Sequence, residues 1–124
     1  MRKLIAGFAT SIDGYIEGSN GEYDWIIFDK EQQKELAEHW KRMDAMFYGR
    51  KTYEAAIAMH VKSKGKKQHN PFAHMAHYVF SKTLTSVQEG FILINGDTEE
   101  EVLQIKISQE KTSLCLAAPI LLVH

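Results

Sequence analysis

Short, largely apolar runs recur along the chain and are separated by polar stretches. Such runs occupy residues 4–9, 45–48, 77–80 and 91–94. The first of them shows no clear alternation of apolar and polar positions, which is typical of a strand buried on both faces. We therefore expect four strands, with the segment 4–9 as a central strand of the sheet.

Helical signals lie between these runs. Residues 30–42 are almost all good helix formers, and Asp29 with Gln32 three positions later has the form of a capping box. Apolar positions of this segment recur at helical spacing, so one of its faces should lie on the sheet. The sequence therefore predicts a helix from Asp29 through Arg42.

Two further helices are expected. One follows Gly49 and includes an alanine-rich stretch, and the other runs from a capping residue at Asp97, paired with Glu100, to about residue 109. The lysine-rich segment 61–70 has no apolar period and is expected to be an exposed loop. Strands that alternate with helices predict an α/β fold with a largely parallel sheet.

Composition narrows the classes of function. The 124 residues suit one domain, and a formal charge of −1 gives no sustained field for binding nucleic acid or an anionic membrane. The single cysteine excludes an internal disulfide and fits a cytoplasmic protein, as does the lack of a signal peptide or a bilayer-spanning run. The six histidines show no metal-ligand spacing, so no metal is expected.

The candidate chemistry lies where two predicted strands end. A strand that runs into Gly49 and then a helix leaves backbone N–H groups and the positive end of the helix dipole at one place, which suits an anion. Arg50 and Lys51 add positive charge there, and a second polar turn follows the next strand at residues 81–83. Each segment alone is more simply explained as a turn with solvated side chains. Together they could hold a phosphorylated cofactor.

Four segments, in this order and spacing, resemble the dihydrofolate-reductase-like family that includes the reductase domain of riboflavin biosynthesis. The resemblance covers residues 1–109, and its most specific part is Gly-Arg-Lys-Thr-Tyr-Glu at residues 49–54. The matching segments are Phe-Ala-Thr-Ser-Ile-Asp-Gly-Tyr-Ile (8–16), Asp-Trp (24–25), Asp-Ala-Met-Phe-Tyr-Gly-Arg-Lys-Thr-Tyr-Glu (44–54) and Tyr-Val-Phe-Ser-Lys-Thr-Leu (78–84). The resemblance implies a dihydrofolate-reductase-like fold, a three-layer α/β/α arrangement with a mostly parallel central sheet, and NADPH as cofactor.

The same resemblance implies a role for each matching residue. The phosphates of NADPH would be held at the helix start, with Arg50 near the 2′-phosphate. Ser81 and Lys82 would approach the phosphate of the adenosine ribose. Ala9 and the loop 11–16, with Ser11 and Gly14, would border the nicotinamide. The residues expected at the helix start are Gly49, Arg50, Lys51 and Thr52.

The substrate side is less defined. In true dihydrofolate reductases a carboxylate follows shortly after the loop tryptophan. Asp29 is the nearest match to it after Trp25, although the spacing differs and a proline is absent. Asp29 is therefore the catalytic candidate, while its alternative role as a helix N-cap is favoured by the ranking of capping residues. Asp13 is open to a similar reading, as a residue that stabilises the turn at Gly14.

The segment 111–124 departs from the family pattern, which continues with a strand that ends in two glycines. Codons permitted for this segment, read from each third base, spell Asp-Ile-Phe-Val-Leu-Gly-Gly-Ala. We hypothesise a shift of reading frame near Glu110, which the gene sequence would test. The expected domain is then residues 1–124, incomplete, with C-terminal strands missing and a divergent tail that can still pair through its main chain.

Three functions remain open from the sequence. The first is an NADPH-dependent reductase of a small heterocycle, either pterin-like or ribosylaminopyrimidine-like, such as 5-amino-6-(5-phosphoribosylamino)uracil or dihydrofolate. The second is a truncated, inactive family member that keeps the fold with weak or no nucleotide binding. The third is a non-catalytic module that binds a phosphorylated ligand at residues 49–52. A sheet edge left open by the tail would favour a homodimer.

Overall fold

The computed structural model describes residues 3–7, 9–22, 25–27, 29–63, 73–107 and 113–116, without the side chains of 59–63 and 113–116. Strands and helices follow one another through most of this length. They are, in chain order, β1 (Leu4–Ala6), α1 (Lys30–Lys41), β2 (Met43–Gly49), α2 (Arg50–Ser63), β3 (Ala76–Phe80), β4 (Phe91–Ile94), α3 (Thr98–Ile107) and β5 (Ser113–Leu116).

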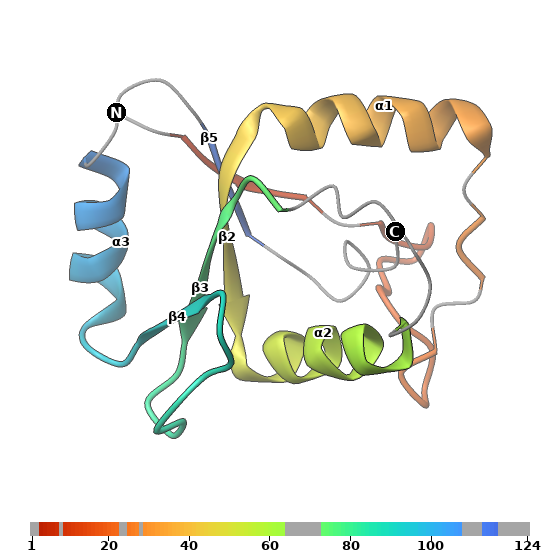
Figure 1. Cartoon of the computed structure of the whole chain (residues 1–124). Helices are drawn as coiled ribbons and strands as arrows, with labels where there is room; N and C mark the ends of the chain where they lie inside the picture. The colour runs from red at the N-terminus through yellow and green to blue at the C-terminus, as the bar shows by residue number, and fades with distance from the viewer. Residues whose placement is uncertain are drawn as a thin grey trace.

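The strands form one parallel sheet between two layers of helix. The strand order is β1-β5-β2-β3-β4, and each neighbouring pair is parallel. Helices α1 and α2 lie on one face of the sheet, and α3 lies on the other (Figure 1). This three-layer α/β/α arrangement with a parallel sheet confirms the fold class that the sequence predicted.

The position of β1 was predicted wrongly. Among the described strands β1 lies at an edge, where Leu4 is 43% exposed and Ala6 is also exposed. The segment 113–116 takes the interior place instead, paired with β1 on one side and with β2 on the other. Main-chain hydrogen bonds make this pairing, and they do not depend on which side chains the segment carries. The tail therefore pairs as a strand, as expected, but it does not form the sheet edge.

Strand β2 is buried on both faces, which explains its continuous apolar pattern. Met46 and Tyr48 pack toward α1 and α2, in the larger core cluster with Trp40. Ala45 and Phe47 point to the opposite face, where they pack in a cluster with Ile105 of α3. The side chains of β2 thus form the centre of both cores.

The helix limits agree with the sequence in part. The capping box at the start of α1 is present, and the helix ends with Arg42 as its C-cap. Helix α2 continues through Ser63, so the predicted loop over 61–70 is wrong for its first three residues. The backbone stays helical there although the sequence has no apolar period. Residues 64–70 lie outside the described residues. No described helix is both long and apolar enough to cross a bilayer.

Candidate functional site

The register of the sheet brings the two candidate turns together. Gly49 at the end of β2 is the Cα partner of Phe80 at the end of β3. Because both strands run in the same direction, Arg50 and Ser81 leave the sheet side by side. The backbone N–H of Ser81 also donates to the carbonyl of Ile94, the last residue of β4, at 3.1 Å. The predicted neighbourhood of residues 49–52 and 81–83 is therefore present at the carboxyl edge of the sheet, where ligands of open α/β sheets bind.

The start of α2 is suited to an anion. Gly49, which precedes the helix, has no side chain that could cap the free N–H groups, and the first turn contains no acidic residue. A Cβ built on Gly49 would meet no described atom within 4 Å, so the space above this residue is open. Lys51 is exposed beside it and Thr52 is half-buried. The free donors, the open space and the cations together fit a phosphate group.

Arg50 is held by side chains from two parts of the chain. Its Nε donates to Glu54 Oε1 at 2.9 Å, one helical turn further on, and its Nη1 donates to Thr83 Oγ1 at 2.7 Å. Ser81 Oγ lies 3.2 Å from the same Thr83 oxygen. A guanidinium has five N–H donors, so these bonds orient Arg50 while leaving donors for a ligand. Lys82 is exposed next to this network.

The aromatic residue of the segment 49–54, Tyr53, has a structural role. Tyr53 is 6% exposed, and its ring packs edge to face on Phe91 with centroids 5.0 Å apart. Its hydroxyl accepts a hydrogen bond from the backbone N–H of Gln88 at 3.0 Å. Tyr53 thus fastens the connection between β3 and β4, which carries Ser81 and Lys82, to the first turn of α2.

The loop after β1 reaches the same edge of the sheet. Ala6 and Phe47 are Cα partners of the same β5 residue, Leu116, so β5 separates this loop from the end of β2. Adjacent strands are about 4.8 Å apart, which places Ala6 at the end of β1 about 10 Å from Phe47, two residues before the end of β2. Ala9 is half-buried at the start of this loop.

The loop itself is a tight turn. The Ser11 hydroxyl donates to Asp13 Oδ1 at 2.5 Å and accepts from the backbone N–H of Tyr15 at 3.0 Å. Gly14 has a φ of +89°, a conformation that favours glycine. The turn-stabilising role of Asp13 is confirmed. Ser11 and Gly14 remain candidates for the cofactor side of this loop, a role that the contacts within the turn do not test.

Asp29 acts as the N-cap of α1. Its carboxylate accepts the backbone N–H of Gln32 at 2.8 Å, and the side chain of Gln32 accepts the backbone N–H of Asp29 at 3.3 Å. The capping role is therefore confirmed, whereas the catalytic role of Asp29 stays a prediction. Trp25 is 39% exposed in the loop that leads to this cap, while Trp40 is 2% exposed in the core.

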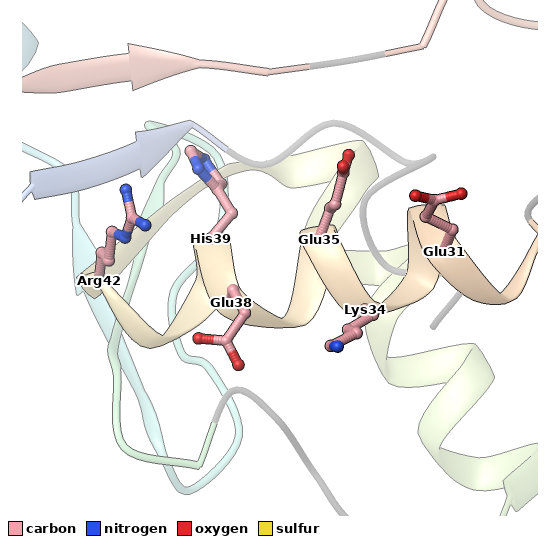
Figure 2. A pocket seen from close by; sticks show the side chains of 6 residues that line it. All are labelled: Glu31, Lys34, Glu35, Glu38, His39 and Arg42. Atoms are coloured by element: carbon pink, nitrogen blue, oxygen red, sulfur yellow. The ribbon is translucent and has the colours of Figure 1, made fainter.

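A shallow hollow along α1 is lined by exposed, mostly charged side chains. Its lining comes entirely from successive turns of that helix, and the side chains project to different sides of it (Figure 2). Lys41, which forms an ion pair with Glu38 at 2.7 Å, lowers the pKa of that carboxyl below its usual value. The lining residues are Glu31, Lys34, Glu35, Glu38, His39 and Arg42. Within the described ranges no group of three or more His, Cys, Asp or Glu side chains could hold a metal.

Two contacts of Arg50 in the site were missed by reasoning from the sequence. Glu54 belongs to the motif that carries the resemblance, and its spacing of four from Arg50 is the spacing of helical ion pairs. Thr83 belongs to the polar turn after β3, but its contact with Arg50 spans 33 positions of sequence. The first contact could have been predicted from spacing, and the second required the strand register.

Comparisons with known proteins agree with this geometry. The model of the family described as the RibD C-terminal domain matches residues 2–122, which extends beyond residue 109 into the tail. The chain is 31% identical over 109 residues to the uncharacterized protein YyaP of Bacillus subtilis (strain 168). That match covers 85% of this chain and 57% of YyaP, so the chain spans little more than half the length of this relative.

Proposed function

Since the chain belongs to the RibD C-terminal domain family, of dihydrofolate-reductase-like fold, we propose that it is an NADPH-dependent reductase of a small heterocycle. One observation carries the proposal. The loop after β1, the start of α2 and the turn after β3 lie in this order along one edge of the sheet. This order matches the nicotinamide, phosphate and adenosine portions of an extended dinucleotide.

The start of α2 would hold the phosphates. The backbone N–H groups after Gly49 donate to phosphate oxygens, and the helix dipole favours their negative charge. Arg50, oriented by Glu54 and Thr83, contacts the 2′-phosphate, and Lys51 adds charge. A planar guanidinium suits this task because it can make two parallel hydrogen bonds to one phosphate.

The other two loops would position the ends of the cofactor. Ser81 and Lys82 lie beside Arg50 and contact the phosphate of the adenosine ribose. Ala9, Ser11 and Gly14 border the nicotinamide, and the exposed side chains of Ile12 and Tyr15 in the same loop would exclude water from it. NADPH supplies a hydride when bound, so the chain's own residues have to bind, orient and shield rather than carry out extensive acid–base chemistry.

The substrate is proposed to be pterin-like or ribosylaminopyrimidine-like, as in the reduction of dihydrofolate or of 5-amino-6-(5-phosphoribosylamino)uracil. The resemblance at residues 8–16 and 49–54 supports this substrate class. Asp29 is the candidate for delivering a proton to the substrate, because it follows the loop that contains Trp25. Its carboxylate is exposed, and one of its oxygens remains beyond the bond to Gln32.

A second function is favoured by one feature of the sequence. The strand β5 ends at Leu116 between β1 and β2, and the next residues are Ala117 and Ala118, where the resemblance leads us to expect two glycines. Side chains at those positions would hinder a close approach of the pyrophosphate to the backbone. An inactive relative that keeps the fold is therefore the alternative, and a module that binds another phosphorylated ligand at residues 49–52 is the third possibility.

Titration of the full chain with NADPH and NADH, followed by oxidation assays with a panel of pterins and aminopyrimidines, separates these functions. The reductase proposal expects saturable binding, a preference for NADPH and oxidation with at least one substrate. Weak or absent binding of NADPH, without oxidation, supports the inactive relative. Binding of inorganic pyrophosphate without any binding of NADPH supports the phospholigand module and contradicts the reductase.

We further propose that the chain forms a homodimer. The support is a group of large apolar side chains on α3 and on the edge strand β4 that remain exposed: Ile92 at 46%, Leu103 at 48% and Ile107 at 61%. Apolar groups of this kind are common at interfaces between subunits. Size-exclusion chromatography at low protein concentration tests the proposal, and a stable monomer would contradict it.

A further inference from the structure

Helix α3 carries apolar residues on two of its sides. Val102 and Ile105 face the sheet, where they pack in the cluster that contains Phe47 of β2. Leu103 and Ile107 lie on the outward side and remain 48% and 61% exposed. Among the described helices, α3 lies alone on its face of the sheet (Figure 1). Because a helix that is apolar on several sides is typically buried on several sides, the outward side of α3 is suited to a packing partner.

The outward side also has a hollow of the kind that receives a side chain from a facing helix. Its lining occupies positions i, i+3, i+4 and i+7, and four residues arranged in this way form the hole of knobs-into-holes packing. An exposed leucine of a second helix would fill such a hole, and α3 itself presents one. The lining residues are Glu100, Leu103, Gln104 and Ile107.

Opposite charges flank this apolar surface along the helix. Glu99 lies in the acidic first turn of α3, and Lys106 lies in its last turn. They are seven positions apart, about two turns, so they lie on the same side of the helix, with Leu103 between them. In the described part of the chain neither side chain forms an ion pair. Two copies of α3 therefore attract each other when they are antiparallel, because only that orientation brings each glutamate to a lysine.

We propose that the homodimer forms through α3, which packs antiparallel on α3 of a second copy. The inference rests on the proposed homodimer and adds which element makes the contact and in which orientation. Leu103 enters the hole of the facing helix near the two-fold axis, and Lys106 meets Glu99 of the partner subunit on either side of that axis. A two-fold contact requires one self-complementary surface, and the outward side of α3 combines matching shape with matching charge.

The antiparallel orientation keeps the two proposed cofactor sites apart. Helix α3 connects the parallel strands β4 and β5, so it runs against the strands and begins at the carboxyl edge of the sheet (Figure 1). A two-fold axis perpendicular to α3 reverses the direction of the strands in the second copy. The two carboxyl edges then lie at opposite ends of the dimer, and each subunit binds its cofactor independently.

Two charge reversals in the full chain test the inference. Glu99→Lys and Lys106→Glu each bring like charges together when the variant pairs with itself. Like charges in contact oppose association, so each variant alone should dimerise about 100-fold more weakly than the unsubstituted chain. Analytical ultracentrifugation over a range of protein concentrations measures the dissociation constant of the dimer, and thermal unfolding monitors the fold.

An equimolar mixture of the two variants is the decisive sample. In a mixed dimer, the lysines of one variant face the glutamates of the other, so both ion pairs are restored and the mixture should dimerise about as tightly as the unsubstituted chain. A mixture that stays monomeric would overturn the inference. Dimers of either variant alone that are as tight as those of the unsubstituted chain would also overturn it, and the homodimer would then use another surface.

A matched pair of leucine substitutions gives a second test that does not depend on charge. Leu103→Gln removes the apolar knob from α3, whereas Leu4→Gln makes the same change at a position of similar exposure, 43%, on β1. Leu103→Gln should weaken the dimer about tenfold or more, and Leu4→Gln should leave it unchanged. The opposite result would place the interface at the edge strand β1 and contradict the inference.

The same samples separate this inference from the other proposals. An unsubstituted chain that stays monomeric at every concentration would contradict both the homodimer and the α3 interface. Titration with NADPH decides the reductase proposal independently, because these substitutions lie outside the proposed cofactor site. All four variants should bind NADPH as the unsubstituted chain does.

Discussion

Helices α1 and α3 differ from α2 in whether a carboxylate accepts hydrogen bonds from the backbone N–H groups at the amino end. In α1 the Asp29 carboxylate accepts the N–H of Gln32, and before α3 the Asp97 carboxylate accepts the N–H of Glu100 at 2.9 Å. Both helices also have acidic residues in their first turn. Helix α2 begins after Gly49, with Arg50 and Lys51 and no acidic residue in that turn.

The difference separates two capped helix ends from the end that is proposed to bind a phosphate. Carboxylates at α1 and α3 satisfy the N–H groups and complement the dipole from within the chain, which stabilises the helix and repels a bound anion. At α2 the same donors and the same dipole are left for a ligand. Among the described residues, α2 lacks an acidic residue in its first turn, and this difference, together with the neighbouring turn after β3, supports the proposed phosphate site.

The largest effect is predicted for a variant in which a side chain of the protein caps the amino end of α2. Gly49→Asp would place a carboxylate where the phosphate is proposed to bind, and Gly49 has neither a positive φ nor a neighbour that a Cβ would meet. Like charges brought together cost several kcal/mol, so NADPH should bind about 100-fold more weakly or worse. Calorimetry measures this loss.

The same variant should be slightly more stable, by about 0.5 kcal/mol in its free energy of unfolding, because an aspartate caps better than a glycine. Gly49→Asn is the matched control, since asparagine caps without a charge. Equal binding of NADPH by the unsubstituted chain and Gly49→Asp would show that the start of α2 is not the phosphate site.

The second effect concerns the cation at the open end. Arg50→Lys keeps the charge but cannot bond Glu54, Thr83 and a phosphate at the same time, as the guanidinium can. Loss of hydrogen bonds to a charged group predicts NADPH binding about 10- to 100-fold weaker. Arg50→Ala should be weaker still and should reduce the dependence of the affinity on salt. Unchanged affinity in Arg50→Lys would mean that Arg50 acts only through its charge.

The third prediction concerns Asp29, whose side chain caps the amino end of α1. Asp29→Ala should lower the free energy of unfolding by about 1 kcal/mol, and Asp29→Ser should restore most of it because serine is also a good N-cap. Chemical denaturation measures both changes, and binding of NADPH should stay unchanged. Loss of turnover in Asp29→Ser, which keeps the cap, would support the catalytic role, whereas normal turnover would contradict it.

The smallest effect lies on the charged face of α1. Lys41 lowers the pKa of the Glu38 carboxyl below its usual value of 4.5, through a side-chain hydrogen bond and its charge. A lowered folded-state pKa contributes stability above the unfolded-state value, and that contribution is lost as the pH falls through the lowered pKa. NMR titration should show Glu38 titrating at higher pH in Lys41→Met. An unchanged titration would show that the ion pair is absent in solution.

Much of the fold was predictable because its signals are local. The capping box at Asp29 depends on residues three positions apart, and the buried run of β2 depends on consecutive apolar residues. The interior position of β5 and the edge position of β1 were not predictable, because strand order depends on contacts between distant segments. The end of helix α2 was not predictable either, because the helix continues into the lysine-rich segment as far as Ser63 and the sequence there has no apolar period.

The candidate site was predicted in its location but not in its network. Gly49 and Arg50 were indicated by strand, glycine and helix signals in succession, and Ser81 by its place just after the end of the next predicted strand. The contact of Arg50 with Thr83 depends on the pairing of Gly49 with Phe80, which fixes how two loops meet. Such a contact follows from the register and the side-chain rotamers, and a sequence read one segment at a time contains neither.

Titration of the unsubstituted chain and Gly49→Asp with NADPH tests the central claim most directly. The account predicts saturable binding by the unsubstituted chain and its loss in Gly49→Asp, with the folded structure retained. Saturable binding of equal strength in both proteins, or no binding by the unsubstituted chain at millimolar NADPH, would contradict the claim that the open end of α2 is the cofactor phosphate site.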